Sequence, residues 1–486
     1  MERRMRAITD DMIHMLLERL SKRNITIWTE AGKIKYKAPA GALTSEELQC
    51  IKENKEKIIK YLENHAIWSK GVKEMFPLTS IQKAYLIGSD QAYELGGINA
   101  HYYMELNCCD IDVVRFERAV NEVIARTDAM RTIVLSNGMQ AVLEKVPTYK
   151  IERFEFGNEK DREEKREQWS HCVFDLCKWP LYNIRISYVN KAFPRIHIDF
   201  DCIIMDAWSA KMMIAKIFEV YEGKIVKWGT YSFKQYCLEQ KEYRETHPDN
   251  AAYSYWRKRV TELPPAPDLP YKKKLSELCG HRFDRISQKF SREETSALYK
   301  LVKDNRVTPA ALICTMYMKT LMQYSKNKEF SLNLTLFNRL PLSEEIYNLI
   351  GDFTNIGAIA YRQQKDFWQE VNFVQKQLWE LVRYHSFDGT QILKMIDPMN
   401  RGKAILPVVF TGVLQGDRKT KGFLPNGVSE GYAISQTPQV VLDYQATDFN
   451  GELLVNWDYV IDAFDVEMIH SMFSENIKDL RLLIYS

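Results

Sequence analysis

The chain has 486 residues, of which 45% are hydrophobic and 27% charged, and its formal net charge is +3. This length suits about two to four globular domains, and the nearly neutral charge argues against nucleic acid as a partner. No apolar run approaches the ~20 residues that span a bilayer, so we expect no membrane segment.

The N-terminus and the cysteines indicate a cytoplasmic protein. The first residues, MERRMRAITDD, are partly basic, but no apolar stretch follows them, so the sequence shows no secretory signal. The nine cysteines form no CxxC pair, which favours free thiols over a disulfide framework or a zinc site. The histidines form no HExxH-type cluster, and we therefore expect no metal.

Residues 1–65 are predicted to form a small separate unit. DDMIHMLLERLSKR has apolar residues at helical spacing, and ITIWTEAGKIKYK alternates like the two strands of a hairpin. Thr44 and Glu47 form a capping box that begins a helix, and IKENKEKIIKYLEN continues as an amphipathic helix. The lysines of KIKYK and of this helix indicate either a solvated face or a docking surface for an acidic peptide.

From Phe76 to the C-terminus, strand-like and helix-like segments alternate without an internal repeat. The segment LPPAPDLPYKKK, Leu263–Lys274, holds four prolines and is therefore predicted to be a linker. It separates two predicted lobes, 72–262 and 263–486, each of which has the size of a domain.

The segment HIDFDCIIMDAWS, residues 197–209, concentrates carboxylates where a predicted strand meets a predicted helix. Asp206 has the position of a helix N-cap, and Asp201 that of a residue ending a solvent-facing edge strand. His197 and Asp201 also form an HxxxD pair, a spacing found in histidine-dependent acyltransferases. No GxGxxG, Walker loop or GxSxG elbow occurs, so nucleotide-binding and hydrolase-elbow functions lack support.

Eight segments, taken together and in this order, resemble the core motifs of the heterocyclization domains of nonribosomal peptide synthetases. They are FPLTSIQKAYLIGSD (76–90), RTDAMR (126–131), DCIIMDAWS (201–209), YWRKRVTELPPAPDLP (255–270), NLTLFNRLP (333–341), GDFT (351–354), PVVFTGVL (407–414) and SQTPQVVLD (435–443). The central motif is DxxxxDxxS, which stands where ordinary condensation domains carry HHxxxDG. Residues 1–65 separately resemble the TubC-like N-terminal docking domains of such synthetases.

The chain departs from the family pattern at a few positions. Thr127 and Met130 stand where the family usually shows His and Leu, and Gly412 stands where Ser is common. Cys202 occupies the place of the second histidine of HHxxxDG, and His197 lies outside the matching register. The resemblance therefore implies that no condensation-type histidine base is present.

The resemblance implies an α/β (α+β) fold in which two lobes of chloramphenicol-acetyltransferase type meet in a V around a tunnel. The DxxxxDxxS motif would lie at the middle of this tunnel, and phosphopantetheine arms of carrier domains would reach it from both sides. Asp206 would be structural and would pair with Arg339, because a buried carboxylate needs a charged donor. Asp201 and Ser209 would shape and hydrate the channel floor. The chain itself would bind no cofactor.

The implied reaction joins an upstream acyl thioester to the amine of a carrier-bound Cys, Ser or Thr and then closes a thiazoline or oxazoline ring with loss of water. Ring closure needs an acid/base, and the resemblance assigns this role to Asp443. Thr411 would orient the adduct or relay a proton, and Asn338 and Gln439 would hold the carbonyl or the departing water. On the residues alone, Asp443 is a strand-end carboxylate and Thr411 an ordinary strand residue.

Two other functions stay open at this point. One is a plain peptide-bond-forming condensation or acyltransferase domain with His197 as its base, and the other is a non-catalytic docking scaffold. The expected partners are upstream and downstream carrier domains, an adjacent adenylation domain, and the C-terminal tail of an upstream synthetase, bound through residues 1–65. We expect the chain to be a piece of a longer synthetase, and the choice among Cys, Ser and Thr stays open.

Overall fold

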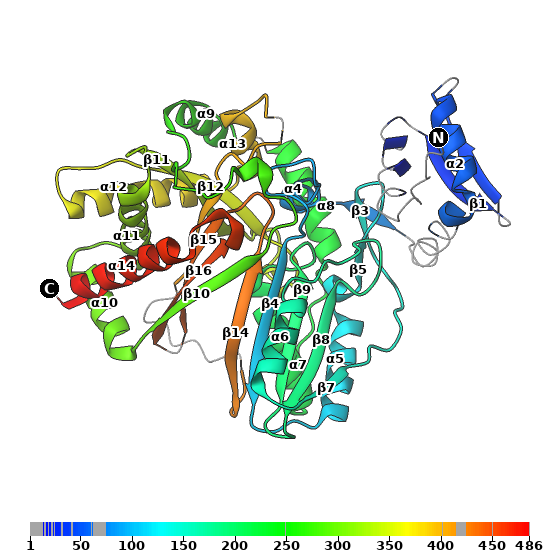
Figure 1. Ribbon diagram of the computed structural model, residues 1–486, viewed down its shortest axis with the longest axis horizontal. Coiled ribbons are helices and arrows are strands. Elements are labelled where there is room, and N and C mark those ends of the chain that lie inside the picture. Colours follow the sequence, from blue (N-terminus) through cyan, green and yellow to red (C-terminus); the bar gives the residue numbers. More distant parts are fainter. Residues whose placement is uncertain are drawn as a thin grey trace, which may run out of the picture.

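The computed structural model describes residues 13, 16–17, 19–20, 23, 25–30, 33–39, 42–59, 61, 74–247, 249–400, 402–414, 424–449 and 451–485. It shows a small N-terminal unit and two larger lobes, each built from a sheet with helices packed on it (Figure 1). No helix within these residues is both long and apolar enough to cross a membrane.

The N-terminal unit contains the hairpin and the helix that the sequence predicts. Strands β1 (Thr26–Glu30) and β2 (Lys33–Lys37) pair in antiparallel fashion, and α2 (Ser45–Glu53) follows. Helix α2 begins at a capping box: the Glu47 amide donates to the Thr44 hydroxyl at 3.2 Å, and the Thr44 amide donates to the Glu47 carboxylate at 3.0 Å. The small core holds Ile13, Leu16, Leu20, Ile25, Ile51, Ile58 and Tyr61.

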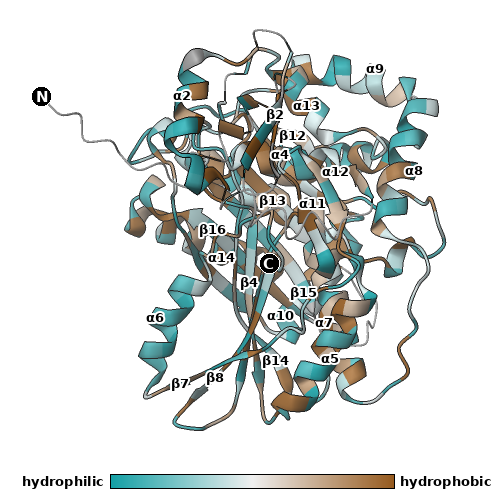
Figure 2. Cartoon of the chain, turned by 90° about the vertical axis from the view of Figure 1, so that its right-hand side faces the viewer, coloured by the Kyte–Doolittle hydropathy of each residue, from teal (hydrophilic) through white to brown (hydrophobic). Residues whose placement is uncertain are grey.

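The N-terminal lobe is a five-stranded sheet in the order β14-β4-β9-β8-β7. Helices α5 (Val113–Arg126) and α7 (Ala207–Tyr221) pack on one face of it, because their apolar stripes share a core with the strands. The hydrophilic helix α6 (Glu159–Trp169) lies on the other side (Figure 2). The strands are β4 (His101–Cys108), β7 (Glu152–Phe156), β8 (Tyr182–Val189), β9 (Arg195–Asp201) and β14 (Val428–Gln436).

Shorter elements surround this sheet. A three-stranded sheet has the order β3-β6-β5, and helices α4, α8 and α9 complete the first half of the chain. Their bounds are β3 (Met75–Pro77), β5 (Thr132–Val134), β6 (Met139–Val142), α4 (Ser80–Gly88), α8 (Phe233–Thr246) and α9 (Asn250–Arg259). Helix α4 also begins at a capping box, formed by Thr79 and Gln82.

The C-terminal lobe is a six-stranded mixed sheet in the order β10-β16-β15-β13-β11-β12, in which β13 runs parallel to both of its neighbours. Its core is aromatic: the ring of Tyr317 lies 4.6 Å from that of Tyr444 and 5.4 Å from that of Trp457. The elements are β10 (Phe283–Phe290), β11 (Phe330–Phe337), β12 (Thr354–Tyr361), β13 (Val408–Val413), β15 (Leu442–Phe449), β16 (Glu452–Val460), α10 (Arg292–Asp304), α11 (Pro309–Tyr324), α12 (Phe367–Arg383), α13 (Gly389–Ile396) and α14 (Val466–Tyr485).

Strand β14 crosses from one lobe to the other. It lies in the chain between β13 and β15 of the C-terminal sheet, yet it pairs in antiparallel fashion with β4 of the N-terminal sheet, with Gln436 opposite His101. In Figure 1, β14 runs beside β4, while β10 and β16 diverge from it on the other side. The two sheets are therefore joined by a shared segment as well as by side-chain packing.

The predicted linker has no regular secondary structure, as its prolines require. It is nevertheless packed against the C-terminal lobe, because the Ser331 amide donates to the Pro265 carbonyl at 2.9 Å and Leu269 is buried. The linker is thus held against this lobe by backbone hydrogen bonding.

Candidate active site

A cavity of about 1470 Å³ lies between the two lobes and is lined by both of them. The N-terminal lobe contributes residues of α4, β4 and the start of α7, among them Tyr102, and also Cys202 in the turn after β9. The C-terminal lobe contributes residues of β10, β11, β13 and β15, among them Thr411 and Asp443. A cavity of this size is large enough to bind a small-molecule substrate.

Asp443 projects into this cavity from β15 because side chains alternate along a strand. Leu442 and Tyr444 are buried in the core of the lobe, whereas Asp443 and Gln445 face the cavity. On the parallel neighbour β13, the Thr411 hydroxyl donates to Oδ1 of Asp443 at 3.0 Å. Gln445 Nε2 donates to Oδ2 of Asp443 at 2.8 Å. Two donors from the protein therefore hold the carboxylate in one orientation.

The pKa of Asp443 is raised to about 6, first by burial and also by the nearby charge of Asp458, although the hydrogen bonds from Gln445 and Thr411 act in the opposite direction. A carboxyl group with this pKa is mostly ionised at neutral pH but accepts a proton readily. It can therefore act as a base and then as an acid within one reaction cycle.

A second carboxylate, Asp458 on β16, lies behind Asp443 and is fully paired. Arg285 on β10 binds it with two hydrogen bonds, Nε to Oδ1 at 2.5 Å and Nη2 to Oδ2 at 2.6 Å. The Ser435 hydroxyl of β14 donates to the same Oδ2 atom at 2.8 Å. The bidentate guanidinium pair and the Ser435 hydroxyl therefore hold the Asp458 carboxylate in a fixed position beside Asp443.

The structure brings together three of the four residues to which the resemblance gives a catalytic role. Gln439 lines the same cavity as Asp443 and Thr411 and has a left-handed backbone, with φ of 63°. Asn338 does not line this cavity. Its Nδ2 donates to the His385 carbonyl at 2.5 Å, and it borders a separate small pocket.

Asp206, Ser209 and Arg339 form a seam between the lobes. Asp206 is the N-cap of α7, since its Oδ1 accepts from the Ser209 amide at 2.6 Å, and its Oδ2 accepts from the Phe353 amide at 3.1 Å. Arg339 Nη2 lies 3.7 Å from Asp206 Oδ1 and donates to the Ser209 hydroxyl at 2.9 Å. Asp206 is thus both a helix cap and the partner of Arg339 across the two lobes.

The structure differs from the expectations for Asp201 and Ser209. Strand β9 is an inner strand, and Asp201 is 2% exposed, so Asp201 does not face solvent. Its carboxylate accepts from Asn99 Nδ2 at 2.8 Å and from the Ile203 amide at 2.9 Å, and burial raises the pKa of Asp201 to about 6. Neither Asp201 nor Ser209 lines the cavity. Both fix the backbone behind its wall, because their polar atoms are already used by the protein.

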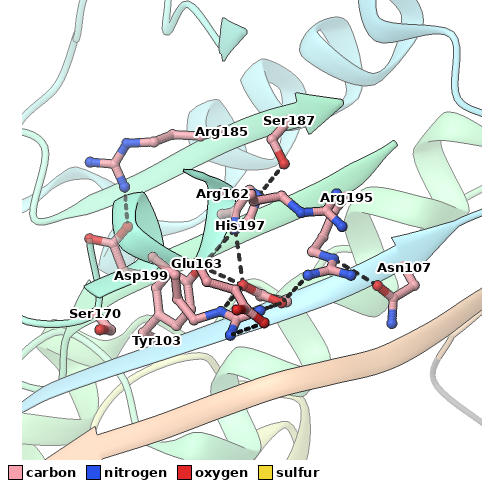
Figure 3. Close-up of polar contacts among 12 residues, drawn as sticks. Tyr103, Asn107, Arg162, Glu163, Ser170, Arg185, Ser187, Arg195, His197 and Asp199 are labelled. Atoms are coloured by element: carbon pink, nitrogen blue, oxygen red, sulfur yellow. Dashed lines mark hydrogen bonds and ion pairs between the residues drawn. The ribbon is translucent and has the colours of Figure 1, made fainter. Parts of the chain in front are cut away.

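His197 does not line the cavity, and Figure 3 shows its side chain among other polar side chains, with Ser187 beside it. Its ring has no exposed surface, and both nitrogens are engaged: Nδ1 lies 2.6 Å from the Tyr103 hydroxyl, and Nε2 lies 2.6 Å from the Ser187 hydroxyl. The carboxylate of Glu105, 3.5 Å from Nδ1, is itself paired with Arg195. Burial lowers the pKa of His197. The histidine is therefore a packed core residue that cannot reach a substrate.

Sequence reasoning missed four residues of the site, namely Thr335, Gln445, Asp458 and Arg285. Thr335 on β11 lies 3.0 Å from the Thr411 hydroxyl and extends the polar chain that ends at Asp443. Gln445 could have been predicted from the sequence, because a residue two positions after Asp443 on the same strand lies on the same face of the sheet. Asp458 and Arg285 gave no such signal, since they meet across 173 positions of the chain.

The part of the chain that the structure describes contains no group of three His, Cys, Asp or Glu side chains arranged to hold a metal ion. In the cavity, the hydroxyls of Thr411 and Thr335 lie in a chain beside the carboxyl group of Asp443.

Comparisons with known proteins agree with this architecture. Residues 72–484 match the model of the Condensation domain, and residues 13–64 match that of the TubC N-terminal docking domain. Bacitracin synthase 1 of Bacillus licheniformis is 30% identical over 422 residues, which cover 84% of this chain and 8% of that protein. Phenyloxazoline synthase MbtB of Mycobacterium sp. (strain MCS) is 27% identical over 84% of this chain and 35% of its own length. The chain thus spans well under half of these relatives.

A solved structure resembles nearly the whole chain. It is the cyclization-docking bidomain of EpoB from Sorangium cellulosum, with a TM-score of 0.77 and 28% identity, and the match covers 97% of this chain and 98% of that one.

Proposed function

Since this chain belongs to the Condensation domain family and carries a TubC N-terminal docking domain ahead of it, we propose that it is the heterocyclization unit of a nonribosomal peptide synthetase. It joins an upstream acyl or peptidyl thioester to a carrier-bound Cys, Ser or Thr and then closes a thiazoline or (methyl)oxazoline ring with loss of water. The observation that carries this proposal is the pair Asp443 and Thr411 in the cavity between the lobes, 3.0 Å apart.

The first stage, amide formation, needs no side-chain base. The neutral amine attacks the thioester carbon, the carbon–sulfur bond breaks, and the departing thiolate takes the proton that the amine loses. Holding the two reactants together in a closed cavity supplies much of the rate increase. This agrees with the burial of His197, the residue that a plain condensation activity of this chain would need as its base and that is inaccessible here.

The second stage needs a proton carrier. The side-chain sulfur or oxygen adds to the amide carbon, and the ionised carboxylate of Asp443 takes the proton that this nucleophile loses. The protonated Asp443 then returns this proton to the former carbonyl oxygen, which becomes a hydroxyl group. The amide nitrogen also gives up its proton to this group, and the oxygen leaves as water while the carbon–nitrogen double bond forms. One oxygen and two hydrogens are lost in total, so atoms and charges balance.

Thr411 and Gln439 assist this stage in our proposal. Thr411 donates to Asp443 while the carboxylate is ionised, and its hydroxyl becomes free to bind the developing oxyanion once Asp443 is protonated. Gln439 lines the same cavity and can hold the carbonyl oxygen through its amide. Asn338 acts from outside the cavity by fixing the segment that carries Arg339.

The remaining assignments are part of the same proposal. The lobes are 72–262 and 263–486, with β14 contributed by the second lobe to the sheet of the first. The partners are upstream and downstream carrier domains, whose phosphopantetheine arms bring the substrates, and an adenylation domain in the same synthetase. Residues 1–65 bind the C-terminal tail of an upstream synthetase along β2, and the protein works in the cytoplasm.

The test is reconstitution with a donor carrier and with acceptor carriers loaded with Cys, Ser or Thr, read out by the mass of the product. Heterocyclization gives a product that is one water lighter than the linear amide with at least one of the three acceptors. A product that stays linear with all three would identify a plain condensation domain, and no product would identify a scaffold.

A further inference from the structure

Gln445 occupies a central position under the proposed catalytic carboxylate. Its Nε2 lies 2.8 Å from Asp443 Oδ2, 2.9 Å from Asp458 Oδ2 and 2.7 Å from the Ser435 hydroxyl. Its Oε1 accepts from Arg285 Nη2 at 2.8 Å. The Gln445 amide thus contacts the carboxylates of Asp443 and Asp458 and the guanidinium of Arg285 on β10.

Arg285 determines which way this amide points. A guanidinium can only donate hydrogen bonds, and a carboxylate without a proton can only accept them. The amide oxygen of Gln445 therefore has to face Arg285, and the NH2 group has to face Asp443. The opposite orientation would place an oxygen against two carboxylates and an NH2 group against a guanidinium, and each of these three contacts would be unfavourable.

The same network reaches the other lobe through Ser435. This residue belongs to β14, the strand that pairs with the N-terminal sheet, and its hydroxyl and amide both donate to Asp458, at 2.8 and 3.0 Å. The orientation of Gln445 is consequently fixed from the C-terminal lobe by Arg285 and from the crossing strand by Ser435. Gln445 presents a defined donor to Asp443 only when both are in place.

We infer that Gln445 is a positioning residue for Asp443 and that Arg285 acts on Asp443 through it. Arg285 forces the Gln445 amide to present its NH2 group, and this group holds the Asp443 carboxylate beside the substrate and in the form that accepts a proton. The inference rests on the proposed function, because it gives Gln445 the task of supporting Asp443, the residue that carries the proton in ring closure.

The charged and polar groups around Asp443 show in which direction the loss of the Gln445 donor changes the pKa of Asp443. Asp458 on β16 raises the pKa of Asp443, whereas Arg285 on β10, Thr411 on β13 and Gln445 lower it. The buried Tyr317 of α11 approaches from the core side and is neutral. Removing the donor at position 445 therefore raises the pKa of Asp443, and the ionised form becomes populated only at higher pH.

The experiment measures ring closure on a preformed, carrier-bound linear amide between pH 5 and 9, with amide formation followed separately. Gln445→Met removes the donor while keeping the length of the side chain, and Gln445→Glu replaces it with an acceptor. We expect ring closure at pH 7 to fall by about tenfold to hundredfold, as for loss of a hydrogen bond to a charged group, and its pH dependence to move to higher pH. Amide formation should be unchanged.

Arg285→Lys tests the second half of the inference. Lysine keeps a positive charge beside Asp458 but lacks the fork that also binds Gln445. The variant should shift the pH dependence in the same direction, and combining it with Gln445→Met should add nothing to the effect of Gln445→Met alone. Gln288→Met is the matched control, since Gln288 lies on β10 but does not line the cavity.

The outcomes separate this inference from the proposed function. If the unaltered protein forms no ring, the proposed function fails. If it forms rings and both Gln445 variants keep its pH dependence, or if a folded Gln445 variant loses amide formation equally, the positioning role is wrong. Additive effects of Arg285→Lys and Gln445→Met would show that Arg285 acts independently of Gln445.

Discussion

Replacing Asp443 with asparagine isolates the proton-transfer role of this residue. Asp443→Asn keeps the size and planarity of the side chain, so the oxygen that accepts from Thr411 at 3.0 Å can stay in place. What it removes is the group that changes its protonation state. The expected result is a protein that makes the linear amide at close to the normal rate and accumulates it.

The size of the effect follows from the pKa of Asp443. With a value of about 6, roughly ten ionised carboxylates exist for each protonated one at pH 7. The unaltered protein therefore has its base almost fully available, and removal of a positioned general acid/base typically costs about 10²–10⁴ in rate. Ring closure by Asp443→Asn should fall by that factor at pH 7.

The pH dependence gives a second, independent readout. Because burial raises the pKa of Asp443, ring closure by the unaltered protein should be slow at pH 5 and should rise through about pH 6 as the carboxylate ionises. Asp443→Asn should show no such rise. The assay is a single turnover on a carrier-bound linear amide, quenched at intervals and analysed by mass for the loss of one water.

Two results would refute this reasoning. Ring closure by Asp443→Asn within tenfold of the unaltered rate would mean that another group moves the proton. Loss of amide formation together with ring closure, in a variant that melts at the normal temperature, would mean that Asp443 binds substrate instead of transferring protons.

Further predictions concern other parts of the molecule. Thr411→Ser should retain ring closure and Thr411→Ala should lose about tenfold, since only the hydroxyl matters; equal losses would point to packing. Asp206→Ala should lower the melting temperature and slow both stages, because it leaves the 6%-exposed Arg339 unpaired at a typical cost of ~3–5 kcal/mol; unchanged melting would contradict this. Burial, followed by the charge of Asp206, raises the pKa of Asp352 to about 8. The contribution of the protonated Asp352 to the free energy of unfolding is therefore fully present below about pH 4 and is lost as the pH rises through 8. Asp352→Asn should thus melt higher than the unaltered protein at pH 8.5, and the gap should close toward pH 4. Deleting residues 1–65 should abolish binding of an acidic upstream tail, which should also weaken with salt, without changing turnover of saturating donor carrier; equal affinity of both proteins would place the docking site elsewhere.

Local patterns were sufficient to predict much of the fold and part of the site. The capping box at Thr44 marks the start of α2. The strand-like QVVLD predicts a strand that ends at Asp443; Asp443 does lie on a strand, but β15 begins at Leu442, so Asp443 is near its start. The position of Asp206 before a helix predicts its cap. These features depend on neighbours within a few residues, and such signals can be read from one sequence.

Features that depend on contacts between residues far apart in the sequence could not be predicted from the sequence. Nothing near Asp458 indicates Arg285 as its partner, and nothing in the sequence of β14 assigns that strand to the other sheet. The alternation at His197 predicts a half-buried strand, but the inner position of β9 and the hydroxyl of Ser187 turn the histidine into a core residue. Burial on both faces of a strand is a property of the assembled sheet.

The shared strand has a consequence for dividing or recombining this protein. If the chain were cut after residue 262, the first fragment would expose the edge of β4, whose unpaired backbone groups readily capture a foreign strand. The second fragment would carry β14 without a sheet to join. Co-produced fragments should therefore reassemble by strand donation, and a chimaera that exchanges one lobe with a relative has to keep 428–436 matched to the β4 it will pair with.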